Sequence, residues 1–381
     1  MMGTPVKNVP DLIRERAREY GNKVFIAQAE TEHDLSYSAL AERCEKMGGL
    51  LAELGVAKGE CVGVLLPNSP EFAVAVMGAQ WIGAFAGPIN TLLKENELEY
   101  ILNHQESKVL VTDADFFPTL NSIINKLTHL EKIVELSTKY PHGIIVHPVK
   151  GVSELKAFYG TSLENSGEMP KEALRGIPKI TTWDQLKVNT PKVSIGDKDP
   201  ALILYTSGTT GVPKGALLSH EAILEVVEHL RKCAEAVPED MILNILPLFH
   251  IFGLVFTLYG PLHAGSTTVT LKTFKPDLFV MSLLKYSITL TAIVPTIAFI
   301  LLQVAEKLGQ DSRFPAQGDL RQQAAVPVHQ KFEQMFNLRI FEGYGLTEAC
   351  MAGCLNTTEG SNRNLRIDGA NEAGAQRVLG F

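Results

Sequence analysis

One segment of the chain joins an apolar run to a loop that is rich in glycine and hydroxyl groups. The run 201–205 (ALILY) predicts a buried strand, and it leads directly into residues 206–215, TSGTTGVPKG. In such a loop glycines let backbone N–H groups turn towards an anion, hydroxyls add donors, and Lys214 supplies positive charge. A helix is expected from about Ser219. We therefore expect this strand–loop–helix segment to hold a phosphate group rather than to form a flexible polar turn.

The residues around Lys214 argue against a P-loop NTPase. The P-loop requires the pattern G-x-x-x-x-G-K-[ST], whereas Pro213 precedes Lys214 and Gly215 follows it. Pro213 has no N–H to donate to a phosphate, and Gly215 has no hydroxyl to bind a magnesium ion. The sequence therefore predicts a phosphate site of another kind.

Three segments resemble, in order, the signature motifs of the acyl-adenylate-forming (AMP-binding) superfamily. They are YTSGTTGVPKG (205–215), PLFHIFG (247–253) and EGYGLTEA (342–349), and LLPNSPEF (65–72) has the family's character as well. The superfamily contains acyl- and aryl-CoA synthetases, peptide-synthetase adenylation domains and luciferases. The resemblance covers most of residues 10–350 and is to the acyl- and aryl-CoA synthetase branch.

The resemblance implies an ATP site. The residues that would surround the ATP phosphates are Thr206, Ser207, Gly208, Thr209, Thr210, Gly211 and Lys214. Those that would bind the adenine ring and the α-phosphate are Glu342, Gly343, Tyr344 and Thr347, with Tyr344 stacked on adenine. Thr206 and Glu348 would be the catalytic residues and would hold Mg²⁺, a hard cation that binds carboxylate, hydroxyl and phosphate oxygens.

The resemblance also places His250 beside the acyl substrate. Outside the PLFHIFG motif, a histidine among apolar residues is more often an ordinary core residue. The segment 252–295 is rich in Phe, Leu, Val and Ile. It would furnish an apolar pocket for a fatty or other apolar acid, although the same residues suit a plain core equally well.

The activity implied is that of an AMP-forming acid–thiol ligase, an acyl-CoA synthetase. A carboxylate would attack the α-phosphorus of Mg·ATP and release pyrophosphate, and the thiol of coenzyme A would then displace AMP from the acyl-AMP. ATP, Mg²⁺ and coenzyme A are thus implied, with a small carboxylic acid as partner. Two other functions stay open. One is amino-acid adenylation, which normally places an aspartate where this chain has PLFH, and the other is a non-catalytic nucleotide- or acyl-binding remnant.

Two departures from the family pattern concern the C-terminal part of the chain. Residues 319–327 lack the Ser-Gly-Gly/Ala loop that packs on adenine, and no Thr-Gly-Asp segment, hinge or lysine-bearing small domain follows Ala349. The tail 356–381 is polar, contains brief apolar pairs and does not resemble barrel strands. We therefore expect a truncated large domain that makes little or no acyl-CoA.

Short apolar strands alternate with amphipathic helices, which indicates an α/β fold with a mainly parallel sheet. The clearest examples are a helix at 36–55 and a strand at 61–66. The resemblance implies two α/β lobes with ATP at their junction, an incomplete β-rich third lobe and no C-terminal small domain. The expected segments are an N-terminal lobe (1–195) with an irregular excursion near 149–191, a second lobe (196–350) and an atypical tail (351–381).

Composition excludes several classes of protein. The 381 residues are 45% hydrophobic and 20% charged, as in a globular protein, and the net charge of −7 disfavours a nucleic-acid binder. Five cysteines, an odd number, do not suggest a disulfide framework. The N-terminus lacks the apolar run of a signal peptide, and the apolar stretch 290–302 is too short to span a bilayer. We expect a cytoplasmic enzyme with no nucleic-acid partner and no transmembrane segment, and homo-oligomers stay open.

Overall fold

The computed structural model describes residues 6–31, 33–136, 143–149, 181–206, 212–308, 331–333, 335, 338–351, 354–355 and 376–380. Contacts divide the chain into two compact units, neither of which is one continuous segment. Unit 1 comprises Met1–Leu40, Pro67–Pro70 and Leu218–Phe381, and unit 2 comprises Ala41–Leu66 and Glu71–Leu217. The expected segments 1–195, 196–350 and 351–381 stay predictions, and most of the excursion near 149–191 lies outside the described residues.

Unit 2 is built on a sheet with the strand order β10-β9-β4-β3-β5-β6-β7-β8. Its strands are β3 (Cys61–Leu65), β4 (Phe85–Pro88), β5 (Val109–Thr112), β6 (Lys132–Leu136), β7 (Gly143–Pro148), β8 (Thr181–Thr182), β9 (Pro200–Thr206) and β10 (Lys214–Ser219). The strands from β9 to β6 pair in parallel, whereas β7 and β8 are added antiparallel. The unit is therefore a mainly parallel α/β sheet, as the alternating pattern predicts.

The helices of unit 2 follow from their apolar patterns. They are α2 (Tyr37–Glu53, which begins in unit 1), α3 (Pro70–Trp81), α4 (Glu95–His104) and α5 (Phe117–Ile123). The helix predicted at 36–55 is confirmed as α2, where Leu40, Cys44, Met47 and Leu51 are fully buried. Its C-terminal end is followed by Gly55, whose φ of +92° favours glycine.

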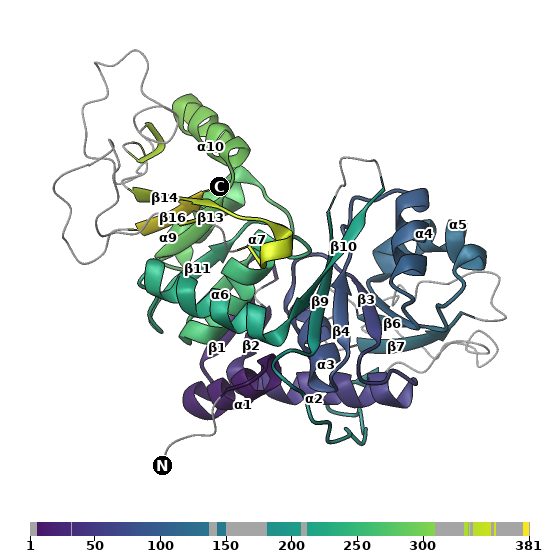
Figure 1. Cartoon of the computed structure of the whole chain (residues 1–381). Helices are drawn as coiled ribbons and strands as arrows, with labels where there is room; N and C mark the ends of the chain where they lie inside the picture. The colour runs from purple at the N-terminus through teal and green to yellow at the C-terminus, as the bar shows by residue number, and fades with distance from the viewer. Residues whose placement is uncertain are drawn as a thin grey trace, which may run out of the picture. The chain divides into compact units, whose positions relative to one another are not determined.

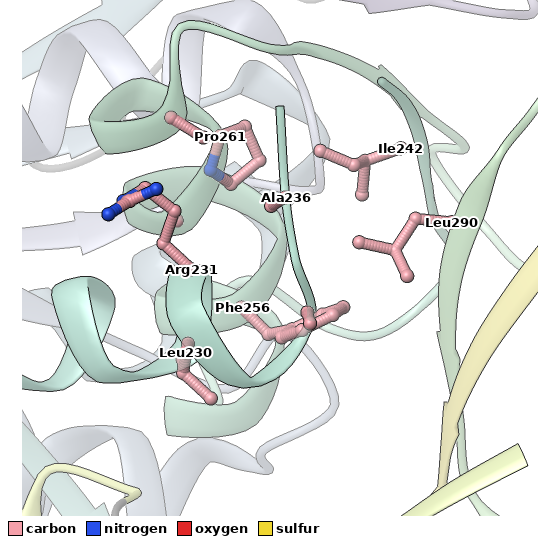
Figure 2. Close-up of a pocket in the computed structure, with 10 residues that line it drawn as sticks. Leu230, Arg231, Ala236, Ile242, Phe256, Pro261 and Leu290 are labelled. Atoms are coloured by element: carbon pink, nitrogen blue, oxygen red, sulfur yellow. The ribbon is translucent and has the colours of Figure 1, made fainter. Parts of the chain in front are cut away.

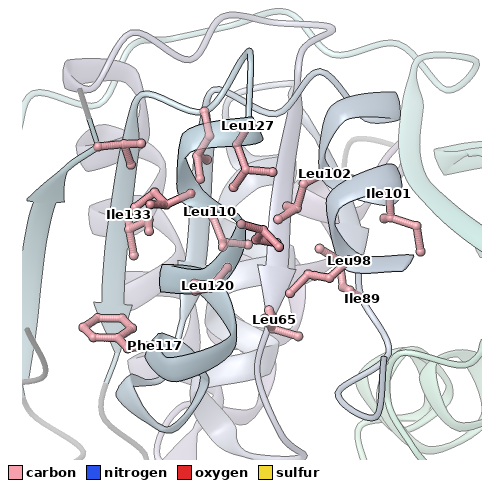
Figure 3. Packing of buried hydrophobic residues seen from close by; sticks show 14 of the residues in the cluster. Leu65, Ile89, Leu98, Ile101, Leu102, Leu110, Phe117, Leu120, Leu127 and Ile133 are labelled. Carbon is pink, nitrogen blue, oxygen red and sulfur yellow. The ribbon is translucent and has the colours of Figure 1, made fainter. Parts of the chain in front are cut away.

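A cluster of buried aliphatic side chains joins the helices of unit 2 to the strands. Figure 3 shows Leu98 and Leu102 of α4 turned towards Leu110 of β5. Leu120 of α5 and Ile133 of β6 belong to the same cluster and are fully buried. Burying one such side chain contributes about 1.5–3 kcal/mol, so this cluster fixes α4 and α5 against the sheet.

Unit 1 is built on a second sheet, with the strand order β15-β14-β16-β13-β11-β12-β1-β2. Its strands are β1 (Val24–Gln28), β2 (His33–Ser36), β11 (Met241–Asn244), β12 (Thr267–Thr270), β13 (Leu290–Ile293), β14 (Leu338–Tyr344), β15 (Cys354–Leu355) and β16 (Gln376–Gly380). The helices are α1 (Val9–Tyr20), α6 (His220–Cys233), α7 (Ile251–Leu254), the π-helical turn η4 (Val255–Tyr259), α8 (Gly260–Ala264), α9 (Pro276–Lys285) and α10 (Pro295–Leu308). Together the two sheets confirm the α/β fold class.

Strand β16 is the main surprise in unit 1. It lies between β13 and β14 and pairs with both in parallel, with Val378 opposite Thr291 on one side and Ile340 on the other (Figure 1). The sequence of the tail does not predict a strand, yet five of its residues form an internal strand of this sheet, third from the β15 edge. The strand that carries the EGYGLTEA motif, β14, therefore joins the sheet through β16.

The expected strand–loop–helix segment is wrong in one respect. Strand β10 begins at Lys214, directly after the loop, and helix α6 begins six residues later at His220. The loop is therefore flanked by two strands, and no helix N-terminus follows it. The expected helix itself is present, and Ser219 caps it by accepting a hydrogen bond from the N–H of Ala222 at 3.2 Å.

The described helices include none that is long and apolar enough to cross a membrane. The apolar stretch 290–302 is divided between strand β13 and the first half of α10.

Candidate functional site

The expected phosphate-binding residues of unit 2 lie at the facing ends of two neighbouring strands. Thr206 is the last residue of β9 and is half-buried, and Lys214 is the first residue of β10 and is exposed. Residues 207–211, which include most of the predicted phosphate ligands, lie outside the described residues. Because strand β10 begins at Lys214 and helix α6 only at His220, the N-terminus of α6 does not directly follow Lys214.

The EGYGLTEA motif of unit 1 places an aromatic ring on the surface. Tyr344 ends strand β14 with 64% of its surface exposed, and Gly343 before it is half-buried. Glu342 lies in the same strand, in register with Gly380 of β16. An exposed tyrosine ring offers a flat apolar face that a heterocycle such as adenine can cover by stacking.

A closed turn follows Tyr344 and presents the remaining motif residues. The carbonyl of Leu346 accepts hydrogen bonds from the N–H groups of Ala349 (3.2 Å) and Met351 (2.9 Å). Thr347 is half-buried and Glu348 exposed in this turn. A Cβ added at Gly345 would lie 1.8 Å from the carbonyl oxygen of Met351, so the turn requires glycine there.

The end of the same turn carries two residues in the left-handed backbone region. Cys350 has a φ of +52° and Met351 a φ of +79°, and neither is glycine. Such conformations cost roughly 1–3 kcal/mol each and persist when the surrounding structure imposes them. Both side chains are buried, at 1% and 3% exposure. Buried packing therefore holds the turn that carries Glu348 in a strained backbone conformation.

The described residues contain no group of three or more His, Cys, Asp or Glu that could enclose a metal ion. Mg²⁺ is usually bound through one or two carboxylates together with substrate phosphates rather than by a closed protein cage. The exposed carboxylate of Glu348 fits that mode of binding. Its role as a magnesium ligand, together with Thr206, stays a prediction.

His250 stands at the start of α7 and is held there by its own hydrogen bonds. Its backbone N–H donates to the carbonyl of Pro247 at 3.1 Å, and Nδ1 accepts from the N–H of Phe252 at 3.2 Å. Gly253 completes the turn, because a Cβ at that position would lie 2.4 Å from the Pro247 oxygen. His250 therefore caps a helix, a structural role that the sequence does not reveal.

The cap also decides which ring nitrogen of His250 can act on a ligand. Because Nδ1 accepts a hydrogen bond, the proton of the neutral ring is assigned to Nε2. Partial burial lowers the pKa of His250 below its ordinary value, which favours this neutral form, although the residue as a whole remains exposed. His250 thus offers one neutral N–H donor at Nε2, which is suited to a carboxylate oxygen.

Asn68 is a residue whose role the sequence analysis missed. Its side-chain Nδ2 donates to the carbonyls of Leu246 (2.9 Å) and Leu271 (3.1 Å), and its Oδ1 accepts from the N–H of Leu248 (2.8 Å). These bonds fasten the segment that leads to His250 onto the end of β12. The Asn-Ser-Pro signal in the sequence indicates only a helix start, because partners 178 to 203 residues away leave no local pattern.

The apolar segment expected to line an acyl pocket contributes mainly to the core of unit 1. The five residues of η4, directly after α7, are at most 4% exposed. Near them lies a cavity of about 20 Å³, bordered by Ile242, Phe256, Pro261 and Leu290 among others (Figure 2). That volume holds about one water molecule, so this cavity is too small for an acyl chain. His250 does not line it.

Comparison with known proteins decides the family. The model of the AMP-binding enzyme family matches residues 13–373. The chain belongs to the AMP-binding enzyme family. The match includes all three motifs, so the resemblance to this family inferred from them is confirmed.

Two curated relatives of this chain are named as CoA ligases of different acids. The sulfoacetate–CoA ligase of Cupriavidus necator is 27% identical over 372 residues, covering 97% of this chain and 65% of the relative. The long-chain-fatty-acid–CoA ligase FadD13 of Mycobacterium tuberculosis is 28% identical over 367 residues, covering 94% of this chain and 64% of the relative. The chain thus spans less than two thirds of the length of these relatives.

A solved structure agrees with the fold. The inhibitor-bound N-terminal domain of FACL13 from Mycobacterium tuberculosis matches with a TM-score of 0.70 and 25% identity, covering 93% of this chain and 79% of that domain. The fold of this chain is therefore similar to that of the FACL13 N-terminal domain.

The predicted site residues fall into three local groups. Gly343 and Tyr344 end strand β14, and Thr347 and Glu348 lie in the turn that follows it; His250 stands at the start of α7 in the same unit. Thr206 and Lys214 belong to unit 2, at adjacent strand ends. Each group has the exposure that a ligand-binding role requires, and none of these roles is yet tested.

Proposed function

We propose that this AMP-binding enzyme is an acid–thiol ligase that joins a carboxylic acid to coenzyme A at the expense of ATP. In the first step a carboxylate oxygen attacks the α-phosphorus of ATP, the bond to the β-phosphate breaks, and pyrophosphate leaves. In the second the thiol sulfur attacks the acyl carbonyl, and AMP leaves as the thioester forms and the thiol proton is released. The match of the family model to residues 13–373 carries this proposal.

In the first step, different residues contact the ATP phosphates, the adenine ring and the substrate acid. Thr206, Lys214 and the loop between them bind the β- and γ-phosphates, and Tyr344 covers one face of adenine. Thr347 contacts the α-phosphate. Glu348 and Thr206 would hold Mg²⁺, which would neutralise phosphate charge when bound. The protein contributes positioning and charge stabilisation and needs no nucleophile of its own.

His250 is the proposed contact to the substrate carboxylate. A neutral Nε2–H donor orients a carboxylate oxygen without forming an ion pair that would weaken it as a nucleophile. The substrate class that we propose is an apolar acid, because the segment after His250 is mostly apolar, with Thr257 as the polar residue of η4. The relatives act on acids as different as sulfoacetate and long-chain fatty acids, so a panel of both kinds belongs in any test.

Thioester synthesis by these 381 residues alone is proposed to be slow. More than a third of the length of the matched relatives has no counterpart in the matched region. Removing one group that stabilises developing charge typically lowers a rate about 10²–10³-fold. Binding and the first step are therefore the informative measurements.

The test of the phosphate assignment is the double variant Thr209→Val/Thr210→Val. Each substitution removes a hydroxyl donor while keeping the side-chain shape. A hydrogen bond to a charged group contributes about 1.5–3 kcal/mol, so the variant should bind Mg·ATP at least about a hundredfold more weakly by calorimetry. Thr128→Val, at a surface threonine elsewhere in unit 2, is the matched control. Unchanged Mg·ATP affinity in the double variant would show that the loop is not the phosphate site.

A further inference from the structure

Helix α4 contacts the residue next to each of the two proposed phosphate-binding residues, Thr206 and Lys214, of unit 2. The Tyr205 hydroxyl oxygen lies 2.7 Å from Nδ1 of His104, and the Tyr100 hydroxyl donates to the carbonyl of Pro213 at 3.3 Å. Tyr205 immediately precedes Thr206 in β9, and Pro213 immediately precedes Lys214 in β10. One helix therefore holds the chain at both of these points.

Helix α4 is itself firmly anchored. Leu98, Ile101 and Leu102 on its inner face are at most 3% exposed and belong to the core of unit 2 (Figure 3). Tyr100 and Tyr205 both pack against that same core. A residue held by α4 is thus held relative to the sheet, not merely relative to a mobile surface helix.

The aromatic rings reinforce the hydrogen bonds. The His104 ring meets the Tyr205 ring edge-on, with centroids 5.6 Å apart, and lies 5.5 Å from the Tyr100 ring. Burial raises the pKa of Tyr205 above its ordinary value, so its hydroxyl keeps its proton at neutral pH. The hydroxyl is therefore able to donate to His104 when the imidazole is neutral and its proton is on Nε2.

A surface groove next to these rings does not account for the contacts that Tyr100 and His104 make with Pro213 and Tyr205. It has a volume of about 440 Å³ and is lined by Asn96, Glu99, Tyr100, Asn103 and His104. Asn103 already donates to the carbonyl of Lys126 and accepts from Thr128, and Glu99 forms an ion pair with Lys126 at 3.1 Å. Much of the polar lining is thus committed to the protein's own structure, which favours a structural purpose for Tyr100 and His104.

We propose that Tyr100 and His104 are positioning residues for ATP, which fix the spacing between Thr206 and Lys214. The inference rests on the proposed function, since it assumes that these strand ends bind phosphate. A ligand binds more tightly when its contacts are already in place, because less conformational entropy is lost on binding. By holding both strand ends, α4 removes that cost before ATP arrives.

The experiment compares Mg·ATP affinity among variants of the 381-residue chain by calorimetry. His104→Ala, Tyr205→Phe and Tyr100→Phe should each weaken binding about three- to tenfold, the effect of one hydrogen bond. The double variant His104→Ala/Tyr205→Phe should bind no more weakly than either single variant, because both remove the same bond. His104→Asn, which keeps a hydrogen-bonding atom at the δ position, should recover most of the affinity.

Two further measurements separate positioning from general damage. Asn96→Ala, at an exposed position on the same helix, should leave Mg·ATP affinity unchanged. Amide hydrogen exchange at Thr206 and Lys214 should be faster in His104→Ala than in the wild type, without ATP present, while exchange in the core strand β3 stays the same. A general loss of stability would accelerate exchange in both places.

The outcomes distinguish this inference from the proposed function. If the wild type binds Mg·ATP and the His104, Tyr205 and Tyr100 variants bind it equally well, positioning by α4 is wrong and the proposed function stands. Failure of His104→Asn to recover affinity would also count against it. If the wild-type chain binds no Mg·ATP, the proposed function is overturned and this inference with it.

Discussion

At the scale of single residues, hydrogen-bond partners decide what a motif side chain can do. The sequence singles out His250 by its motif, but the N–H of Phe252 occupies Nδ1 and leaves Nε2 as the donor. The Tyr344 ring, in contrast, is open to a ligand, because 64% of the residue's surface is exposed and can be covered by stacking. The contacts therefore turn a family resemblance into statements about particular atoms.

The two roles assigned to His250, helix cap and ligand contact, can be separated by two substitutions. His250→Ala removes both the cap and the Nε2 donor, whereas His250→Asn keeps an acceptor at the δ position for the Phe252 N–H and removes only the donor. Both variants should bind the carboxylic acid about ten- to a hundredfold more weakly, as for one hydrogen bond to a charged group. Mg·ATP affinity should change little in either.

The thermal midpoint completes that test. His250→Ala should melt at a lower temperature because losing a helix cap costs roughly 1 kcal/mol, while His250→Asn should melt close to the wild type. An Asn variant that binds the acid normally would show that His250 is a structural residue and makes no ligand contact.

At the scale of elements, the sequence predicts those helices and strands whose burial follows the spacing of their own apolar residues. The helix α2 and the strand β3 are confirmed because burial follows the spacing of their apolar residues. Strand β10 is missed because its residues are mostly exposed or half-buried, so KGALLS has no clear alternation. Strand β16 is missed because its pairing partners, β13 and β14, are decided by long-range register that five residues cannot encode.

The internal position of β16, between β13 and β14, predicts that proline there destabilises unit 1. Val378→Pro removes an N–H from a strand with neighbours on both sides, where proline is normally absent. We expect the free energy of unfolding of unit 1, measured by urea denaturation, to fall by about 1–3 kcal/mol, the cost of leaving a buried hydrogen-bond acceptor unsatisfied. Val212→Pro, at an exposed residue between the strands of unit 2, is the control and should cost far less. Equal stability of Val378→Pro and wild type would mean that β16 is not an internal strand.

At the scale of the whole molecule, a partly buried histidine makes stability depend on pH. His263 of α8 has 18% of its side chain exposed and lies 3.8 Å from the Glu228 carboxylate. Burial chiefly, with the positive charges of Arg16, Arg231 and Lys232, lowers the pKa of His263 to about 4 from 6.5, against the opposing effect of Glu228. The folded chain therefore binds fewer protons than the unfolded chain between these two values.

The sign of the pH effect follows from that difference in protonation. The contribution of His263 to the free energy of unfolding is fully present above pH 6.5. It falls as the pH drops towards 4, because protons bind preferentially to the unfolded chain. The loss should reach at most about 3 kcal/mol, less some screening by solvent. His263→Gln should remove this part of the pH dependence in urea denaturation at pH 7, 5.5 and 4.5. An unchanged slope in that variant would contradict the lowered pKa.

The most direct test of ligase chemistry is exchange of labelled pyrophosphate into ATP. This measurement follows the first step in reverse and needs no coenzyme A, so it does not depend on thioester synthesis. With Mg·ATP and a panel that includes long-chain fatty acids and sulfoacetate, the wild-type chain should show exchange that depends on at least one acid. Lys214→Ala should lower that exchange at least tenfold, since it removes the positive charge next to the phosphate loop. A chain that binds Mg·ATP but gives no exchange above the acid-free background with any acid would contradict the proposed activity.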